Sequence, residues 1–305
     1  MNYGKALGKK DHKQSPLIFG EVLFDCFNDG RKNLGGAPFN VAWNLQAFGM
    51  SPLLISRVGN DDLGRRIREE MRSWDMDTDC LQVDPSSPTG TVRIDLTNGE
   101  PRFTILPNQA YDNIAPLKIN QKHERPFLYH GTLALRNDGS RNTFSYLKHI
   151  YQCPVFLDVN LRTPWWDTDD VITLIEDATW LKLNEAELNL LFPGKVNMEE
   201  RCRQLLDRFQ LDTVFITLGA KGSLALNRDK ILSVTTPQEN IAIMDTVGAG
   251  DAFSSVLLLG LMHGWPLPTS LQRSQEFASA VIGQRGAITH DKNFYKTFSD
   301  RWNLR

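Results

Sequence analysis

One stretch of the sequence combines two glycines with a carboxylate at the start of an apolar helix. Gly248, Ala249 and Gly250 precede Asp251, and the residues that follow predict a long buried helix ending near His263. The backbone NH groups of the first three residues have no partner inside such a helix and, together with the helix dipole, favour a bound anion. A carboxylate at that place repels an anion, so Asp251 requires an explanation.

Two interpretations of Asp251 follow from the residues alone. An Asp in the first turn can simply complement the helix dipole. It can also act as a catalytic base that takes the proton of a hydroxyl while that oxygen attacks a phosphoryl group. The other common phosphate motifs do not fit, because G-x-x-x-x-G-K-[ST] is absent and Phe253 stands where a dinucleotide fingerprint needs its third glycine.

Residues 245–253 resemble the D-T-x-G-A-G-D motif of the ribokinase-like (PfkB) sugar and nucleoside kinases. The resemblance implies that Asp251 is the catalytic base and that the amides of residues 248–250 form an anion hole. It also implies ATP as the phosphoryl donor, with Mg²⁺ to neutralise it. Relatives commonly bind K⁺ through backbone oxygens around this motif, which would place Asp245 and Val247 beside the ion.

Composition restricts the alternatives. The chain has 305 residues and a formal net charge of −2, which suggests no polyanion-binding surface and therefore no nucleic-acid partner. Its four cysteines form no C-x-x-C pair, which is typical of reduced thiols in a cytoplasmic protein. No run of eighteen apolar residues predicts a membrane span. Residues 1–16 lack the apolar segment of a signal peptide, and we expect a flexible tail there.

Polar residues near the N-terminus are expected to line a sugar site. The stretch from Leu17 to Asp25 is predicted to form one strand with Asp25 at its end, where ligands bind in open α/β sheets. A turn-forming Asp is the alternative. Gly35, Gly36 and Asn40 resemble the G-G-x-x-x-N element of the family, which implies that they line the sugar site.

A β-hairpin interrupts the expected α/β pattern. Residues 91–97 and 103–106 alternate between apolar and polar, and Asn98-Gly99 between them is a strong two-residue turn. The resemblance implies a small β lid over the sugar, formed by about residues 24–34 and 88–107. Such a lid would exclude water, which competes as a phosphoryl acceptor.

From residue 127 onward, short apolar strands alternate with segments of helical length. This alternation predicts an α/β fold with a mostly parallel sheet covered on both faces. We therefore expect a Rossmann-like three-layer sandwich of the ribokinase-like type, forming a single kinase domain over residues 17–305. The expected strands cover residues 127–131, 155–160, 180–184, 214–219 and 241–243, and the last expected helix covers 270–283.

Two further elements concern the nucleotide and the metal. Asn184 and Glu187 fit the family's N-x-x-E element, which implies a place near Mg²⁺, usually through water; without the resemblance Glu187 is an ordinary first-turn Glu. Thr217, Gly219 and Gly222 fit its T-x-G-x-x-G nucleotide loop.

The C-terminal part departs from the family pattern in one respect. Gly286 belongs to a Gly-Ala pair that the family places near the nucleotide. Many relatives carry an Asn at the start of the preceding helix that approaches the adenine, whereas residues 274–276 of this chain are Ser-Gln-Glu. The contacts to the base are therefore not carried over.

Residues 158–162 resemble the D-x-N-x-R element, which implies that Arg162 contacts the sugar, and Trp166 favours the fructokinase branch. An ion pair of Asp158 with Arg162 is the structural alternative. We expect an ATP-dependent kinase that phosphorylates a primary hydroxyl of a small sugar, with fructose as the expected acceptor. A ribose, 2-keto-3-deoxygluconate or nucleoside kinase, or a silent sugar-binding regulator, are the alternatives. Exposed lid edges, through which relatives often pair, would allow a homodimer.

Overall fold

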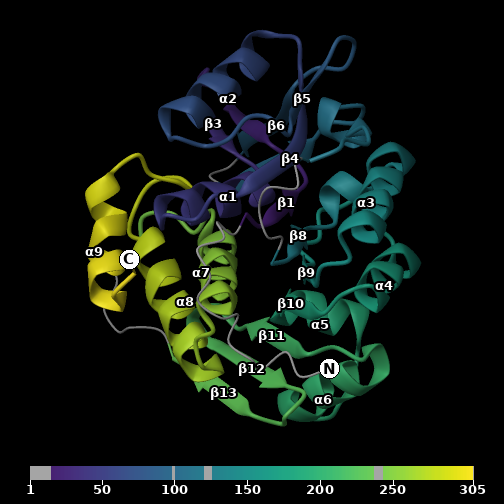
Figure 1. Cartoon of the computed structure of the whole chain (residues 1–305), viewed down its shortest axis with the longest axis vertical. Coiled ribbons are helices and arrows are strands. Elements are labelled where there is room, and N and C mark those ends of the chain that lie inside the picture. The colour runs from purple at the N-terminus through teal and green to yellow at the C-terminus, as the bar shows by residue number, and fades with distance from the viewer. Residues whose placement is uncertain (1–14, 98–99, 120–125, 237–242, 305) are drawn as a thin grey trace.

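The computed structural model describes residues 15–97, 100–119, 126–236 and 243–304, which form two sheets and two layers of helices (Figure 1). The larger sheet has nine strands in the order β13-β12-β11-β10-β9-β8-β1-β4-β5. Their bounds are β1 Leu17–Phe19, β4 Leu53–Gly59, β5 Leu81–Asp84, β8 Leu128–His130, β9 Val155–Asp158, β10 Trp180–Asn184, β11 Thr213–Thr217, β12 Ser223–Asn227 and β13 Leu232–Thr235.

The seven neighbouring strands of this sheet from β11 to β5 in the order above run parallel, namely β11, β10, β9, β8, β1, β4 and β5. Strands β12 and β13 are added antiparallel at the β11 edge. The carboxyl ends of the parallel strands therefore lie along one edge of the sheet, where open α/β folds bind ligands. The strands predicted from residue 127 onward to residue 219 agree with β8 to β11 within one or two residues.

Helices cover both faces of the larger sheet. In β1, Ile18 packs with residues of α1, α7, α8 and α9, whereas Leu17 and Phe19 pack with α3 on the opposite face. Figure 1 shows the first group on the left and α3 to α6 on the right. The three-layer sandwich is thus confirmed. The helices are α1 Ala37–Ala47, α2 Asp62–Ser73, α3 Asp138–Tyr151, α4 Thr168–Glu176, α5 Glu185–Leu191, α6 Met198–Phe209, α7 Ala249–His263, α8 Leu267–Val281 and α9 Lys292–Trp302, with short 3₁₀ turns η1 Ala110–Asn113, η2 Leu133–Leu135 and η3 Gly219–Lys221.

The smaller sheet has four strands in the order β3-β2-β6-β7 and lies at the upper end of the molecule in Figure 1. Its strands are β2 Leu23–Phe27, β3 Lys32–Gly35, β6 Gly90–Thr97 and β7 Glu100–Ile105. Strands β2 and β6 pair parallel, and the other pairs are antiparallel. The expected turn at Asn98-Gly99 lies outside the described residues, although the pairing of Thr97 with Glu100 brackets it.

The predicted strand from Leu17 to Asp25 was wrong, because the chain leaves the larger sheet after Phe19 and enters the smaller sheet at Leu23. Gly20 makes this exit with a φ of 145°, and a Cβ there would lie 2.5 Å from Pro38 Cγ. Only glycine tolerates both conditions.

The elements near the C-terminus also differ from those predicted. The helix expected at 270–283 begins earlier, at Leu267, and it is not the last, since α9 follows it. Of the expected strand at 241–243, residues 241 and 242 lie outside the described residues, and Ile243 belongs to no strand. Most of the expected tail, residues 1–14, also lies outside them. Among the described helices, none has the length and apolar character needed to cross a bilayer.

Candidate active site

The loop before α7 is held in a conformation that requires glycine. Gly248 is the N-cap residue of α7, with a φ of 81°, and a Cβ there would lie 2.4 Å from the Ala287 Cβ. The Asp245 carboxylate fixes the loop from both sides, because its two oxygens accept hydrogen bonds from the amides of Val247 at 3.0 Å and Gly286 at 3.1 Å. The Gly286–Ala287 turn therefore packs directly against the residues that open α7.

Asp251, in the first turn of α7, meets Asn40 of α1. Asn40 Nδ2 donates to Asp251 Oδ2 at 2.7 Å, although the two residues are 211 positions apart in the chain. Burial raises the pKa of Asp251, while the hydrogen bond from Asn40 lowers it. Asp251 as a residue is partly exposed. A carboxylate with raised proton affinity that is not fully covered suits general-base chemistry.

Asp25, Gly35 and Asn40 face one small space. The position that a Cβ would take on Gly35 lies 3.8 Å from both Asp25 Oδ2 and Asn40 Oδ1. Burial raises the pKa of Asp25 to about 6, and the nearby charge of Arg162 lowers it. Arg162 also lowers the pKa of Asp251, so its guanidinium lies within electrostatic reach of both carboxylates. The structure thus brings together the residues that the sequence assigned to the sugar.

A buried ion pair lies beneath the start of α7. Lys182 Nζ donates to both oxygens of Asp158, at 2.8 and 2.9 Å, and Ser254 Oγ donates to the same carboxylate at 2.6 Å. The ammonium is 3.7 Å from the position of a Cβ on Gly250. The alternative pairing of Asp158 with Arg162 was therefore wrong. The Lys182 ammonium therefore lies close to the helix terminus, with the Asp158 carboxylate as its counter-ion.

Sequence reasoning missed Lys182, which lowers the pKa of Asp251, and Glu21, whose own pKa is raised by burial and by the charge of Asp251. The signal was present in the sequence. Lys182 lies between Leu181 and Leu183 in a short apolar strand, and Glu21 interrupts the apolar run that begins at Leu17. A charged residue inside an apolar run becomes buried, and buried charges require partners.

Asn184 and Glu187 form a capping box at the start of α5. Asn184 Oδ1 accepts from the Glu187 amide at 2.8 Å, and Glu187 Oε2 accepts from the Asn184 amide at 2.9 Å. Glu187 Oε1 accepts from the Leu161 amide at 2.9 Å, and burial raises the pKa of this carboxyl. Both carboxylate oxygens keep a further lone pair. Within the described residues, no group of three or more His, Cys, Asp or Glu side chains could hold a metal ion.

The glycine loop after β11 lies beside this capping box, because Thr217 pairs with Asn184 across the sheet. Gly219 has a φ of 58° and no atom within 4 Å of the position of a Cβ. Gly222 has a φ of 96°, and a Cβ there would lie 1.9 Å from the Thr235 carbonyl oxygen. The loop therefore presents bare backbone on one side and packs tightly against β13 on the other.

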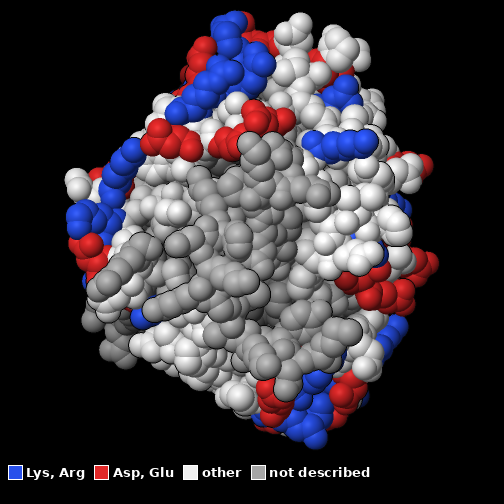
Figure 2. All heavy atoms as spheres, viewed as in Figure 1, with Lys and Arg blue, Asp and Glu red and all other residues white. Residues whose placement is uncertain are grey.

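Charged side chains of both signs lie on the face of the molecule shown in Figure 2. Figure 2 shows basic and acidic side chains in small mixed groups on the visible face, without a broad basic surface among the described residues. This agrees with the net charge of −2.

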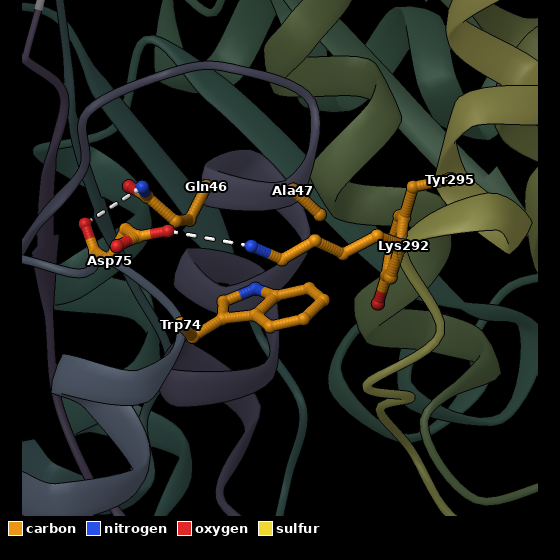
Figure 3. Close-up of a pocket in the computed structure, with 6 residues that line it drawn as sticks. All are labelled: Gln46, Ala47, Trp74, Asp75, Lys292 and Tyr295. Atoms are coloured by element: carbon orange, nitrogen blue, oxygen red, sulfur yellow. Dashed lines mark hydrogen bonds and ion pairs between the residues drawn. The ribbon is translucent and has the colours of Figure 1, made fainter.

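A separate hollow of about 150 Å³ lies near the end of α1 (Figure 3). The Lys292 ammonium lies 5.5 Å from the centroid of the Trp74 ring and 3.5 Å from Asp75 Oδ2. Gln46 Nε2 donates to the Asp75 carbonyl at 2.9 Å. These polar groups are paired within the protein, and we assign no ligand to this hollow.

The family model for pfkB carbohydrate kinases matches residues 19–293. The chain belongs to the pfkB family. Within that family, a fructokinase of Klebsiella pneumoniae is 30% identical over 297 residues, covering 89% of this chain and 94% of that protein. A protein of Pyrococcus horikoshii described as a sugar kinase is 31% identical over 239 residues, covering 76% and 74%.

Solved structures agree with this membership. A fructokinase double mutant from Vibrio cholerae, crystallised with fructose, ADP and potassium, has a TM-score of 0.78 at 25% identity and covers 94% of this chain and 99% of its own. As a pfkB protein, the chain is a carbohydrate kinase. Its fold is ribokinase-like, as the motifs predicted.

Proposed function

We propose that the protein transfers the γ-phosphoryl group of ATP to a primary hydroxyl of fructose, with Asp251 as the base. The hydrogen bond between Asn40 and Asp251 carries this proposal. It joins the residues that face the acceptor space to the helix terminus that favours an anion, so an acceptor hydroxyl and a phosphoryl group would meet at one carboxylate. The fructokinases among the relatives favour fructose.

In this mechanism the acceptor lies beside Gly35 and Gly36, with hydroxyls bound by Asp25, Asn40 and Arg162. Asp251 takes the proton of the attacking hydroxyl. The amides of residues 248–250 and the buried Lys182 ammonium stabilise the negative charge of the transferring phosphoryl group.

The nucleotide would lie along the neighbouring strand ends. We assign its binding to Asn184, to Thr217, Gly219 and Gly222 of the glycine loop, and to Gly286. Glu187 would hold Mg²⁺ through water, and the ion supplies charge neutralisation of the phosphates when bound. Backbone oxygens of Asp245 and Val247 are the candidate ligands for K⁺, since the Asp245 side chain is already engaged with two amides.

We also propose that the smaller sheet acts as a lid over the acceptor within one kinase domain, since Asp25 lies on β2 and Gly35 ends β3. A lid that carries acceptor contacts excludes water as the acceptor binds.

A coupled assay of ADP release over a panel of acceptors tests the proposal. The panel contains fructose, ribose, 2-keto-3-deoxygluconate, fructose 6-phosphate and nucleosides, each with ATP and Mg²⁺. We expect the highest kcat/KM with fructose. If another acceptor is phosphorylated and fructose is not, the proposal of fructose as the acceptor is wrong, while the kinase activity stands. Binding of sugar without turnover of any acceptor would identify a silent regulator instead.

A further inference from the structure

The chain leaves the smaller sheet at the end of β7, and two side chains from elsewhere in the molecule bind this exit. Trp165 Nε1 donates to the Ile105 carbonyl oxygen at 3.2 Å, and Arg136 Nη2 donates to the Leu106 carbonyl oxygen at 2.7 Å. Ile105 is the last residue of β7, whereas Arg136 follows η2 and Trp165 lies between β9 and α4. Two consecutive carbonyls at the exit are therefore bound by two separate elements.

Arg136 is connected to a second strand of the smaller sheet through Asp112. Its side chain is 3% exposed, and Nε and Nη2 donate to the two oxygens of Asp112 at 2.7 and 2.8 Å. A bidentate pair of this kind fixes the orientation of both groups. Asp112 Oδ2 also accepts from the Gln109 amide at 2.9 Å, and Gln109 Oε1 accepts from the amide of Thr91, in β6, at 3.2 Å.

Arg136 and Trp165 also contact each other. The Arg136 Cζ atom lies 4.2 Å from the centroid of the Trp165 ring and 5.4 Å from that of the Tyr111 ring. An aromatic face attracts a guanidinium, and the attraction is stronger where water is excluded. Both rings belong to the apolar cluster that includes residues of β2 and β6. We refer to Ile105, Leu106, Asp112, Arg136 and Trp165 as the latch.

The latch continues into the turn that carries Arg162. The Trp165 amide donates to the Arg162 carbonyl oxygen at 2.7 Å, which closes a β-turn over residues 162–165. On the other side of Arg162, the Leu161 amide donates to Glu187 Oε1 at 2.9 Å. The backbone at Arg162 is thus held between α5 and the latch. A movement of the latch shifts one of these two anchors and changes the direction of the Arg162 side chain.

We propose that Arg136 and Trp165 are positioning residues for the acceptor: they tie the smaller sheet to the turn that carries Arg162, so that the sheet and this arginine move together. The inference rests on the proposed function, in which Arg162 binds the acceptor, and deepens it. When the smaller sheet opens, it pulls on the turn through Ile105 and withdraws Arg162. None of the residues assigned to the nucleotide belongs to the latch, so we expect ATP binding to be independent of it.

Trp165→Phe removes the indole donor and keeps an aromatic ring for Arg136. We expect the dissociation constant of fructose, measured by calorimetry, to rise about three- to tenfold while the affinity for ATP stays unchanged. In an Arg162→Ala background the same change should alter that constant by less than about twofold, because the latch acts through Arg162. A role in stability alone would weaken fructose binding equally in both backgrounds.

Arg136→Lys tests the latch in the free protein. Lysine keeps a positive charge beside Asp112 but loses the bidentate pair and the planar contact with the Trp165 ring. We expect amide hydrogen exchange to become at least about threefold faster both in β7 and in residues 159–166, measured against β12 as the internal reference. Arg136 lies in neither segment, so a joint change shows that the two are coupled.

Trp180→Phe is the matched control for Trp165→Phe. Trp180 is also partly buried, but it begins β10, at the opposite end of that strand from Asn184. Its substitution should change neither the fructose affinity nor the exchange of β7 and residues 159–166.

Three results would overturn the inference. They are an unchanged fructose affinity in Trp165→Phe, an equal loss of affinity with and without Arg162, and faster exchange of β7 alone in Arg136→Lys. If the wild type binds no fructose, the proposed acceptor is wrong, and the exchange of free Arg136→Lys then decides the latch by itself.

Discussion

A 2.7 Å hydrogen bond joins Asn40 of α1 to Asp251 of α7, two helices that pack in the same layer. For Asp251 the raised proton affinity and the partial exposure coincide with a helix terminus that attracts anions. Complementing a helix dipole requires only the charge of such a residue. Base catalysis requires its proton affinity and its position as well, and these two roles respond differently to substitution.

Asp251→Asn tests the role of the base. The amide keeps the size of the side chain and removes its ability to take a proton. We expect kcat to fall by about 10²- to 10⁴-fold while fructose and ATP bind with nearly unchanged affinity. Steady-state kinetics and calorimetry measure the two quantities. Turnover near that of the wild type would show that Asp251 only complements the dipole.

Glu21 makes the stability of the protein depend on pH. Its pKa is about 7 in the folded protein against 4.5 ordinarily, so the folded state favours the protonated form. The contribution is fully present below pH 4.5 and is lost as the pH rises through 7. At pH 8 the loss is about 3 kcal/mol as an order of magnitude. Glu21→Gln should therefore raise the free energy of unfolding at pH 8 and not at pH 4, as urea titrations at both pH values would show. If Glu21→Gln changed the free energy of unfolding, relative to the wild type, by the same amount at pH 4 and at pH 8, the assigned pKa would be contradicted.

Gly248 and Gly250, at the start of α7, have different backbone surroundings. Gly248 has a φ of 81° and almost touches Ala287, whereas Gly250 has ordinary helical space, with Lys182 Nζ at 3.7 Å from the position of a Cβ. Gly248→Ala should lower the free energy of unfolding by at least about 1–2 kcal/mol. Gly250→Ala should keep or raise stability by up to about 1 kcal/mol, yet lower activity by placing a methyl group among the anion-binding amides. Thermal unfolding and kinetics of the pair provide the comparison. Equal stability losses would refute the assigned backbone roles.

The pair of Lys182 and Asp158 joins β10 to β9, and Ser254 of α7 donates to the same Asp158 carboxylate. Lys182→Met leaves a buried carboxylate without its cation, and we expect a loss of about 3–5 kcal/mol. Adding Asp158→Asn should recover most of that stability but not the activity, because the cation beneath the helix terminus stays absent. Denaturant titration and kcat of the single and double variants measure this. Recovery of activity in the double variant would leave Lys182 with a structural role only.

Elements were predictable where local pattern decides them. Strands β8 to β11 and helix α7 follow from apolar periodicity and from Gly264 at the helix end. The residues of the acceptor space followed from motifs. The end of β1 at Gly20 could not be predicted from the sequence. The apolar run continues through this position, and only tertiary packing against Pro38 requires the turn. The partner of Asp158 was also missed, because the choice between Arg162 and Lys182 depends on which strand lies alongside β9.

At the scale of the whole molecule, the proposed acceptor site draws residues from both sheets. The smaller sheet carries Asp25 and Gly35, whereas Asp251 and Arg162 belong to the larger body. If the smaller sheet is a lid, fructose together with an ATP analogue should slow amide hydrogen exchange in β6 and β7 by roughly tenfold, which corresponds to about 1.4 kcal/mol. Exchange in β12 serves as the internal reference. Unchanged exchange in β6 and β7 with both ligands bound would argue against closure.

The distance along the chain between Asn40 and Asp251 also has a consequence for synthesis. A ribosome adds about 5–20 residues per second, so the 211 positions from Asn40 to Asp251 take roughly ten to forty seconds to synthesise. During that interval α1 lacks α7, α8 and α9, against which its apolar side chains pack. The apolar side chains of α1 therefore stay without these packing partners until residues 249–302 have been synthesised. The contact between Asn40 and Asp251 cannot form before then.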